Sequence, residues 1–442
     1  MRFSNLFFLC SLLAASVATV QAQQEEADNR FDINLYMLSH GEMRYGGLGD
    51  QFTESTPETD HAYFLMGRSR LTMNYRRTGL EAKVTAQHSG IWGQQGQGSF
   101  NLYEAWVKMT AKCGLFAQVG RQALSYDDER IIGPDDWAMA SMSHDVFRGG
   151  YEGHGHRAHV ILGFNQNAEN TYGGTYYANG SQPYKTMMTL WYHYDVPIFP
   201  LGASLLFMNI GMQAGEEGGT GMNAPENRYQ QLYGGYLLFN PNRFSLEGSY
   251  YCQKGHDEHN AVLNAWMASV KLQYEATHWA KAVAGFDYLS GDDYFAVPKP
   301  GMIGTTYHAQ LKGFSPVYGS RHKFYGMMDF FYVQTYVNGF SPGLQNLYAG
   351  GIFKPTEKLT FSAIYHYLAM ATHLNGIDLT LGHDIEIEAS YKIMRDVELS
   401  VGFSYMDGTE TMEKLKRAAD KDALKWAWFS LVVNPRVFST KW

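Results

Sequence analysis

Long stretches of alternating apolar and polar residues are the feature that most constrains this fold. Between Ala62 and Arg76, one set of alternate positions is apolar or small, and the other set is rich in arginine. Because successive side chains of an extended strand point to opposite faces, this pattern predicts a strand with one apolar and one polar face. The apolar face carries Tyr63, Leu65, Gly67, Ser69, Leu71, Met73 and Tyr75, and the polar face carries Phe64, Met66, Arg68, Arg70, Thr72, Asn74 and Arg76.

The pattern recurs along the chain, in stretches too long for a soluble sheet. Residues 80–87, 103–109, 384–391 and 397–405 alternate in the same way, with Tyr103, Ala105, Val107 and Met109 expected on an apolar face. A soluble β-sandwich also alternates, but its strands have about 5 or 6 residues. Runs of about 10 to 14 residues match a tilted strand that crosses a membrane. Length therefore favours a transmembrane barrel over a sandwich.

The connections between these stretches alternate between short and long, as in bacterial outer-membrane barrels. Short connections lie at 77–79, 112–114, 153–155, 240–243, 354–358 and 395–396, and long ones at 40–61, 125–144, 166–183, 215–226, 291–343, 373–381 and 407–421. We therefore predict an all-β, antiparallel, up-and-down barrel of about 18 strands, with short periplasmic turns and long extracellular loops. Residues 322–337 resemble a further strand, but counting it makes the number odd. We assign 291–343 to one long loop that narrows the pore, and 424–438 to the closing strand.

The N-terminal residues predict a secretory signal peptide over residues 1–22, which leaves 23–442 as a single barrel domain. A basic start at Arg2 is followed by an apolar run from Leu6 to Val20 and by small residues around Ala22. A retained helical anchor is the alternative, but the run is shorter than the ~20 residues that a spanning helix needs. Aromatic residues make up 15% of the chain and charged residues only 18%, as a barrel with a lipid-facing surface requires. The net charge of −8 argues against nucleic acid as a partner.

Motifs that carry chemistry are weak. Asp127 to Glu129 with Asp135 and Asp136 could bind calcium or form a solvated loop. His154 and His156 could bind a transition metal or belong to a surface turn. The chain contains no H-E-x-x-H or P-loop motif. We predict no catalytic residues, no metal site and no cofactor, and keep an outer-membrane enzyme with its active site in the loops as an alternative.

Charged residues on the polar faces are the candidate functional residues. The early strands are rich in cations and the late strands in carboxylates, and barrel closure brings the two sectors close together around one pore. Such charges could select charged solutes, or they could brace the wall through salt bridges; both interpretations stay open. The predicted pore-lining residues are Arg68, Arg70, Arg76, Lys83, Glu104, Lys108, Arg121, Arg130, Arg148, Arg157, Glu386 and Glu388.

Several motifs resemble the alginate-export family of outer-membrane barrels. They are Val119-Gly120-Arg121-Gln122, Ser125 to Gly133 with Asp136-Trp137, His144 to Arg148, Leu289 to Asp293, His322 to Gly326 with Met328 to Phe331, Gly343 to Asn346, and Leu381 to Glu386. The resemblance implies an 18-stranded barrel whose arginines line an anion-selective pore, here Arg68, Arg70, Arg121, Arg130 and Arg148. The acidic late sector and net acidic balance depart from the alginate exporter, which puts alginate as the solute, and outward traffic, in question.

Together these patterns predict a channel in the outer membrane of a Gram-negative bacterium. We expect it to pass small polar or anionic solutes, such as uronates or other saccharides. The expected partners are outer-membrane lipid and lipopolysaccharide, the barrel-assembly machinery and the solute itself. A structural or adhesive barrel plugged by its loops is a further alternative.

Overall fold

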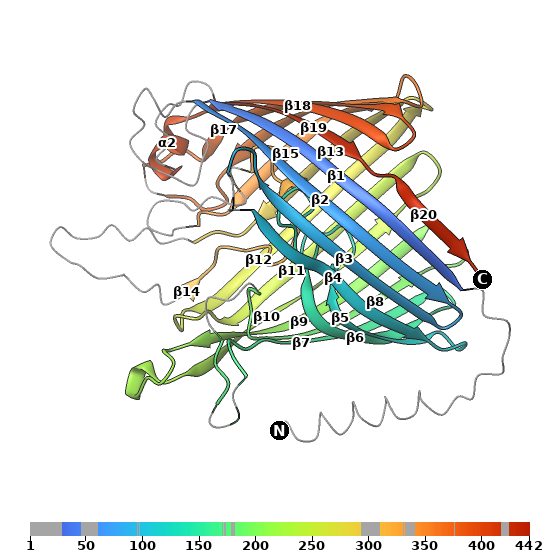
Figure 1. Ribbon diagram of the computed structural model, residues 1–442. Helices are drawn as coiled ribbons and strands as arrows, with labels where there is room; N and C mark the ends of the chain where they lie inside the picture. The colour runs from blue at the N-terminus through green and yellow to red at the C-terminus, as the bar shows by residue number, and fades with distance from the viewer. Residues whose placement is uncertain are drawn as a thin grey trace.

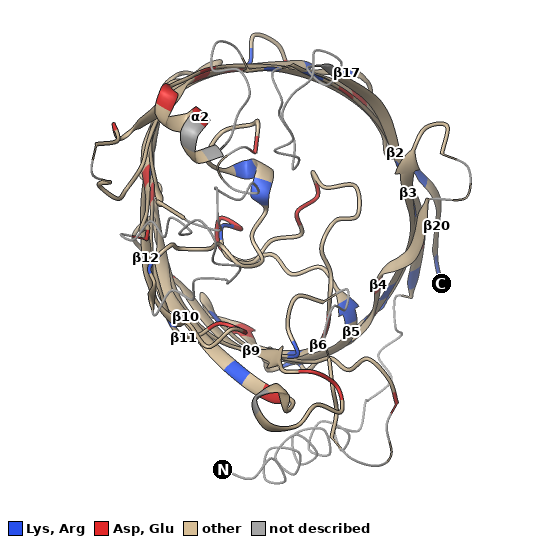
Figure 2. Ribbon diagram, turned by 90° about the vertical axis from the view of Figure 1, so that its left-hand side faces the viewer, with Lys and Arg blue, Asp and Glu red and all other residues tan. Residues whose placement is uncertain are grey.

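The chain forms a closed antiparallel β-barrel (Figure 1, Figure 2). The computed structural model describes residues 29–45, 61–94, 96, 98–169, 171, 174–177, 182–292, 310–329, 331, 341–374, 376–416 and 424–442. The predicted signal peptide, residues 1–22, lies outside these ranges. Of the 20 strands of the sheet, β14 is a two-residue segment in a loop, and β20 continues β19 after a break. The described residues thus form 18 spanning strands, which confirms the predicted fold.

The strands and helices have the following bounds: β1 Arg30–Tyr45, β2 His61–Arg77, β3 Leu80–Ile91, β4 Ser99–Thr110, β5 Leu115–Gln122, β6 His144–Gly153, β7 His156–Phe164, β8 Thr186–Asp195, β9 Leu201–Ala214, η1 Gly221–Asn223, β10 Glu226–Phe239, β11 Phe244–His256, β12 Val262–Thr277, β13 Ala280–Leu289, β14 Gln310–Leu311, η2 Arg321–Lys323, β15 Leu344–Phe353, β16 Leu359–Ala369, β17 Thr380–Met394, β18 Val397–Gly408, α2 Glu410–Lys416, β19 Leu424–Val433 and β20 Arg436–Lys441.

The barrel closes where β1 pairs with β2 on one side and with β19 and β20 on the other. The closing strand, predicted as one stretch over 424–438, is interrupted at Asn434 and Pro435. Proline has no backbone N–H to donate to the sheet, and the register against β1 shifts between Ile33 and Asn34. β20 then continues to Lys441, beyond the predicted end of the closing strand.

The outward face of the wall carries apolar residues between two levels of paired aromatic rings. We call the end of the barrel with the short connections the turn end, and the other the loop end. At the turn end, ring centroids are 5.0 Å apart in Phe199–Phe239 and 4.7 Å apart in Phe244–Tyr274. Toward the loop end, Trp266 stacks on Tyr288 at 4.6 Å. Two aromatic levels enclosing an apolar band are typical of a barrel that spans a membrane. None of the helices in the described part of the chain is both long and apolar enough to cross a bilayer.

One predicted side-chain orientation is wrong. Tyr103 was expected on the lipid-facing row with Ala105 and Val107, but its side chain is buried, with 5% of the residue exposed. The register between β3 and β4 shifts between Thr85 and Ala86, so that β4 has one extra residue there. A β-bulge of this kind turns the residues beyond it to the opposite face. Tyr103 therefore lies on the lumen side.

Two loops fold back into the barrel and pack against each other. The first inner loop comprises residues 123–143, between β5 and β6, and the second comprises residues 310–329 of the long connection between β13 and β15. They meet in a short parallel bridge between Ile132 and Tyr318, with a hydrogen bond of 2.8 Å from the Gly133 N–H to the Tyr318 carbonyl. Figure 2 shows chain crossing the lumen inside the ring of strands.

The described part of residues 322–337, namely 322–329 and 331, contains no strand. Over 321–329 the chain forms the 3-10 turn η2 and an irregular segment. Residues 330 and 332–340 lie outside the described part of the chain.

Candidate functional site

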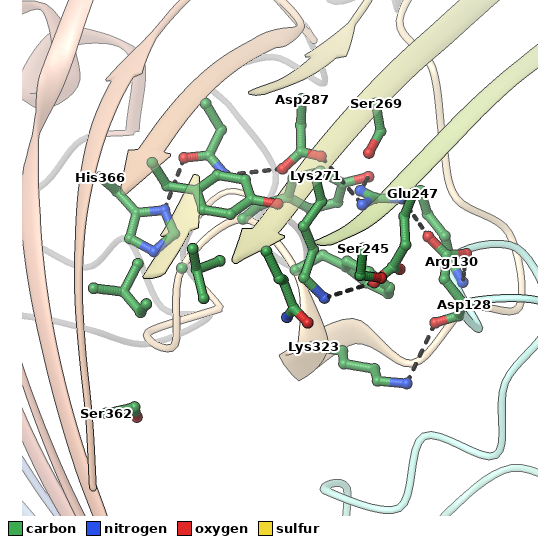
Figure 3. A pocket seen from close by; sticks show the side chains of 18 of the residues that line it. Asp128, Arg130, Ser245, Glu247, Ser269, Lys271, Asp287, Lys323, Ser362 and His366 are labelled. Atoms are coloured by element: carbon green, nitrogen blue, oxygen red, sulfur yellow. Dashed lines mark hydrogen bonds and ion pairs between the residues drawn. The ribbon is translucent and has the colours of Figure 1, made fainter. Parts of the chain in front are cut away.

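The inner loops and the wall from β10 to β17 enclose a cavity of about 780 Å³ (Figure 3). Its floor on the wall side is built from the inward rows of β10 to β13 and β15 to β17, and its roof from both inner loops. Hydroxyl, amide, aromatic and charged groups all reach it. Charged and polar lining residues include Asp127, Asp128, Arg130, Asn240, Ser245, Glu247, Ser269, Lys271, Gln273, Asp287, Lys323, Asn346, Ser362, His366, Glu386 and Glu388.

Arg130 joins the two inner loops to the wall. Its guanidinium is 3.1 Å from Asp287 of β13 and 3.2 Å from Asp128 of its own loop. It donates a hydrogen bond of 2.9 Å to the Tyr325 hydroxyl and lies over the Phe324 ring at 4.0 Å. The arginine is 3% exposed. A fully desolvated charge needs such partners on every side, because burial alone is costly.

A chain of polar contacts continues from Asp287 along the wall. The Asn346 amide donates to the Asp287 carboxylate at 3.0 Å, and its oxygen is 2.8 Å from the His366 ring nitrogen Nδ1. The other ring nitrogen of His366 is 3.4 Å from Glu386, which accepts the backbone N–H of Met327. These contacts run across β13, β15, β16 and β17 at one level and end on the second inner loop. The wall therefore anchors that loop at two points, through Arg130 and Glu386.

A second polar surface of the cavity is the ladder between β11 and β12. Glu247 and Lys271 are register partners whose charged groups are 3.2 Å apart. The Tyr236 hydroxyl donates to Glu247 at 3.2 Å. The pairs above and below are Ser249 with Ser269 and Ser245 with Gln273. This surface offers donors and acceptors suited to hydroxyl-rich solutes.

Arg68 and Arg70 of β2 hold the first inner loop rather than lining open space. Arg68, which is 2% exposed, donates to the carbonyls of Asp136 and Ala138 at 2.9 and 3.1 Å and to the Ser141 hydroxyl at 2.7 Å. Arg70 donates to the Asp136 carboxylate at 3.0 Å. These contacts fix the loop against the wall on the side opposite to the cavity.

The other predicted cations of the early strands lie on inward rows and have nearby partners. Lys83 pairs with Glu104, and Arg76 is 3.3 Å from Glu81. Lys108 is 3.8 Å from Glu152, Arg148 donates to Gln118 at 2.6 Å, and Arg157 donates to Asp195 at 2.6 Å. Of the twelve predicted residues, the cavity walls include Arg130, Glu386 and Glu388.

Arg121 is placed differently from the prediction. It lies on the row of β5 that carries Val119, which is 57% exposed on the outward face, and its register partner Ala105 also faces outward. Arg121 forms a two-pronged ion pair with Asp145 of β6, at 2.8 and 2.5 Å. The structure therefore assigns it to the outer surface near the loop end and not to the pore.

The acidic residues considered as calcium ligands bind protein groups in this structure. Asp127 accepts hydrogen bonds from the Ser204 hydroxyl at 2.5 Å and the Trp191 indole at 3.1 Å. Asp135 accepts the Arg321 backbone N–H at 3.1 Å. Burial raises the pKa of both carboxyls above the ordinary value. Within the described ranges, no group of three or more His, Cys, Asp or Glu side chains is arranged to hold a metal ion.

The sequence prediction missed several cavity residues, including Glu247, Lys271, Asp287, Asn346 and His366. A usable signal existed for Lys271, since Val270, Leu272 and Tyr274 alternate with Lys271 and Gln273 as in the strands that were identified. No comparable signal pointed to Asp287, whose role depends on an arginine far away in the sequence.

Solved structures with the same fold include proteins of Pseudomonas. Pseudomonas aeruginosa OccK9 (OpdG) matches with a TM-score of 0.61 at 11% identity, covering 92% of this chain and 98% of its own. A BenF-like porin from Pseudomonas fluorescens Pf-5 matches with a TM-score of 0.59 at 10% identity, covering 92% and 99%. Pseudomonas aeruginosa OccK2 (OpdF), solved in complex with glucuronate, matches with a TM-score of 0.58 at 11% identity, covering 92% and 98%.

Sequence comparison gives the family. No curated protein sequence matches this chain significantly. The family model for alginate export matches residues 88–379, about two thirds of the chain, and this range includes both inner loops and most of the cavity wall. The chain therefore belongs to the alginate export family of outer-membrane barrels.

Proposed function

We propose that this protein is a passive outer-membrane channel for small polar or anionic solutes, of the uronate or saccharide type. The observation that carries the proposal is the cavity of about 780 Å³ inside a closed barrel, between inner loops that narrow the lumen and a wall lined with polar and charged groups. A solute of a few rings fits such a volume, since small-molecule sites commonly have about 300 to 1,000 Å³. The glucuronate complex of OccK2 (OpdF) belongs to a protein of the same fold.

Hydroxyls, amides and ion pairs in the cavity favour a saccharide. The Lys271–Glu247 pair and the neighbouring Ser245 and Gln273 can exchange hydrogen bonds with sugar hydroxyls. The Tyr236 and Tyr348 side chains add flat apolar faces to the same cavity. Lysines and arginines of the inward rows favour a carboxylate on that sugar.

A channel fits the chemistry better than an enzyme does. Two Ser–His–carboxylate arrangements exist, Ser430–His40–Glu42 and Ser204–His193–Asp195, and such triads can activate a serine. Ser204 is 3% exposed and its hydroxyl donates a hydrogen bond to Asp127, so its O–H points away from His193. Ser430 is 9% exposed. Neither serine lines the cavity of the candidate site. We therefore infer that these groups connect neighbouring strands.

We also propose the route by which the protein reaches the membrane. Residues 1–22 would direct Sec export, the barrel-assembly machinery would insert the chain, and the outward face would contact outer-membrane lipid and lipopolysaccharide. The supporting observation is the apolar outward band between two aromatic levels described above.

Planar-bilayer recording tests the channel, with a pair of opposite substitutions as matched controls. Lys271→Gln should lower the anion-to-cation permeability ratio, and Glu247→Gln should raise it, because each removes one charge from the same cross-strand pair. Micromolar to millimolar glucuronate should block the current more strongly than glucose does. A purified barrel that does not conduct, or two variants with the same selectivity as the unmodified protein, would refute the proposal.

A further inference from the structure

A second hollow lies on the outward face of the barrel, away from the lumen. It has a volume of about 710 Å³ and crosses strands β7 to β11. The apolar side chains that line it project outward and are partly exposed; they are Val160, Leu190, Tyr192, Leu205, Phe207, Tyr233 and Tyr250. We call this hollow the outer groove.

Small residues on the outward rows create the outer groove. Ala158 of β7 and Gly235 of β10 lie among the large apolar side chains that line it. A Cβ at Gly235 would lie 2.7 Å from the Ser204 carbonyl oxygen and 3.4 Å from Leu205. The floor is therefore bare backbone, and the flanking aromatic and aliphatic side chains form its sides. Such a shape accepts a long apolar chain lying along the wall.

A band of polar residues crosses the outward face just beyond the loop end of the groove. Asn209, Gln231, Lys254 and Asn264 are consecutive register partners on β9, β10, β11 and β12. The Gln231 amide donates to Asn209 at 2.7 Å, and the Lys254 ammonium donates to Asn264. We call these four residues the polar band.

The polar band lies at the height where lipid headgroups are expected. Phe244, in the aromatic level at the turn end, and Lys254 are on the same outward row of β11, ten residues apart. Ten residues span about 33 Å of strand, which a tilt near 40° reduces to about 25 Å along the membrane normal, the usual height of the apolar band. The next outward row contains Cys252 and Trp266, and the Trp266 ring lies 5.9 Å from that of Tyr250, one outward row further toward the turn end; these two rings mark the interface. The polar band is therefore at the headgroup level of the leaflet on the loop side.

We propose that the outer groove and the polar band together bind one phosphorylated glycolipid of the outer leaflet. The acyl chains would lie in the groove, and Lys254 would bind a phosphate. Its ammonium carries three N–H donors, of which Asn264 accepts one. In the described part of the chain no carboxylate forms an ion pair with Lys254, and the side chain is exposed. The amides of Gln231 and Asn209 can bond the hydroxyls of a sugar headgroup, which a simple phospholipid offers in smaller number.

The shape of the groove argues against a second copy of the barrel as its occupant. In a two-fold dimer the same surface must contact itself, and two hollows facing each other would leave both unfilled. This inference concerns the lipid-facing surface and does not depend on which solute the channel passes.

Native mass spectrometry of the delipidated full-length barrel in a neutral detergent tests the proposal, with lipid A as the probe. We expect one lipid A per chain, bound more tightly than dephosphorylated lipid A or phosphatidylglycerol. Lys254→Gln should weaken this binding about tenfold, as the loss of a charge-assisted contact does, and Ala158→Trp should weaken it by filling the groove. Lys425→Gln is the matched control and should have no effect, because Lys425 lies on the outward row of β19 over the Tyr45 ring, seven strands away.

Three results would overturn the proposal. The first is lipid A binding that Lys254→Gln leaves unchanged. The second is equal binding of phosphatidylglycerol, which would assign the groove to phospholipid. The third is a dimer that Ala158→Trp dissociates, which would assign the groove to a second copy of the chain. Heat-modifiable electrophoretic mobility of each variant reports whether the barrel has folded, and Lys254→Gln alone suffices if Ala158→Trp does not fold.

Discussion

Replacing Arg130 by methionine should release the inner loops from the wall. The substitution keeps a long, flexible side chain but removes the guanidinium that pairs with Asp287 and Asp128 and binds the Tyr325 hydroxyl. Asp287 is 2% exposed, so its carboxylate would be left charged without its cation. The wall itself is held by backbone hydrogen bonds between strands and should stay closed.

The expected cost follows from the burial of this pair. Removing one partner of a buried ion pair costs about 3 to 5 kcal/mol, because the remaining charge stays desolvated. Each 1.36 kcal/mol corresponds to a tenfold change in an equilibrium. The population of channels with detached inner loops should therefore rise by about a hundredfold or more in Arg130→Met. Single-channel conductance should increase as the lumen widens, and trypsin should cleave the second inner loop faster.

A double variant separates this explanation from a loss of packing. Arg130→Met with Asp287→Asn removes the charge of Asp287, the more deeply buried of the two carboxylates that Arg130 pairs with, so it should recover part of the unmodified conductance and protease resistance. If Arg130→Met leaves both measurements unchanged, the inner loops are held by other contacts and the reasoning is wrong. If the double variant is as open as the single one, the effect comes from lost packing and not from the uncompensated carboxylate.

Two further predictions concern the first inner loop. Arg68→Met removes three hydrogen bonds to residues 136–141, so proteolysis of this loop should accelerate. The control Arg76→Met, at the turn end, should leave the rate of proteolysis unchanged. Equal rates in the two variants would contradict the bracing role of Arg68. Burial raises the pKa of the Asp127 carboxyl, so the attached loop binds a proton more tightly than the detached loop. Attachment should therefore strengthen as pH falls through the raised pKa toward the ordinary value of about 3.9. Asp127→Asn should flatten this dependence in protease-resistance measurements between pH 4 and 7, and a persisting slope would assign it to another group.

The wall of the barrel was predictable because it depends on local pattern. The alternation of apolar and polar residues determines the face on which each side chain lies. The length of each alternating run determines that the strand crosses the membrane, and the lengths of the connections distinguish the two ends of the barrel. The same rule places Arg121 outward, since Val119 and Leu115 precede it on one row. The motif that contains Arg121 gave the opposite assignment, and the register of the strand decides in favour of the outer surface.

The bulge at Tyr103 could not be found from alternation. Tyr103 and Glu104 are adjacent and both buried, which no two-residue period allows. A three-dimensional contact explains the exception, since the Arg70 guanidinium lies over the Tyr103 ring at 3.9 Å. Such a contact is worth up to about 2 kcal/mol when it is desolvated. It involves residues on β2 and β4 that the sequence does not bring together.

The cavity was the least predictable part, because its contacts join distant segments. Arg130 meets Asp287 across more than 150 positions, and Glu386 meets the backbone of Met327. Neither contact leaves a periodic trace in the sequence. Loop length predicted a role inside the barrel for the 291–343 segment, but it could not say which wall residues would contact residues 310–329.

Burial separates the two interpretations of the charged lumen, wall bracing and solute selection, by height along the pore. The side chains of Arg68 and Arg130 are 2% and 3% exposed, so they have exchanged water for fixed protein partners and hold the inner loops in place. The side chains of Arg76 and Arg157, near the turn end, are 69% and 44% exposed, and their fields reach the lumen. Bracing therefore belongs to the level of the inner loops and solute selection to the level below them. Substitutions at the first level should change how far the channel opens, and substitutions at the second should change which ions it prefers.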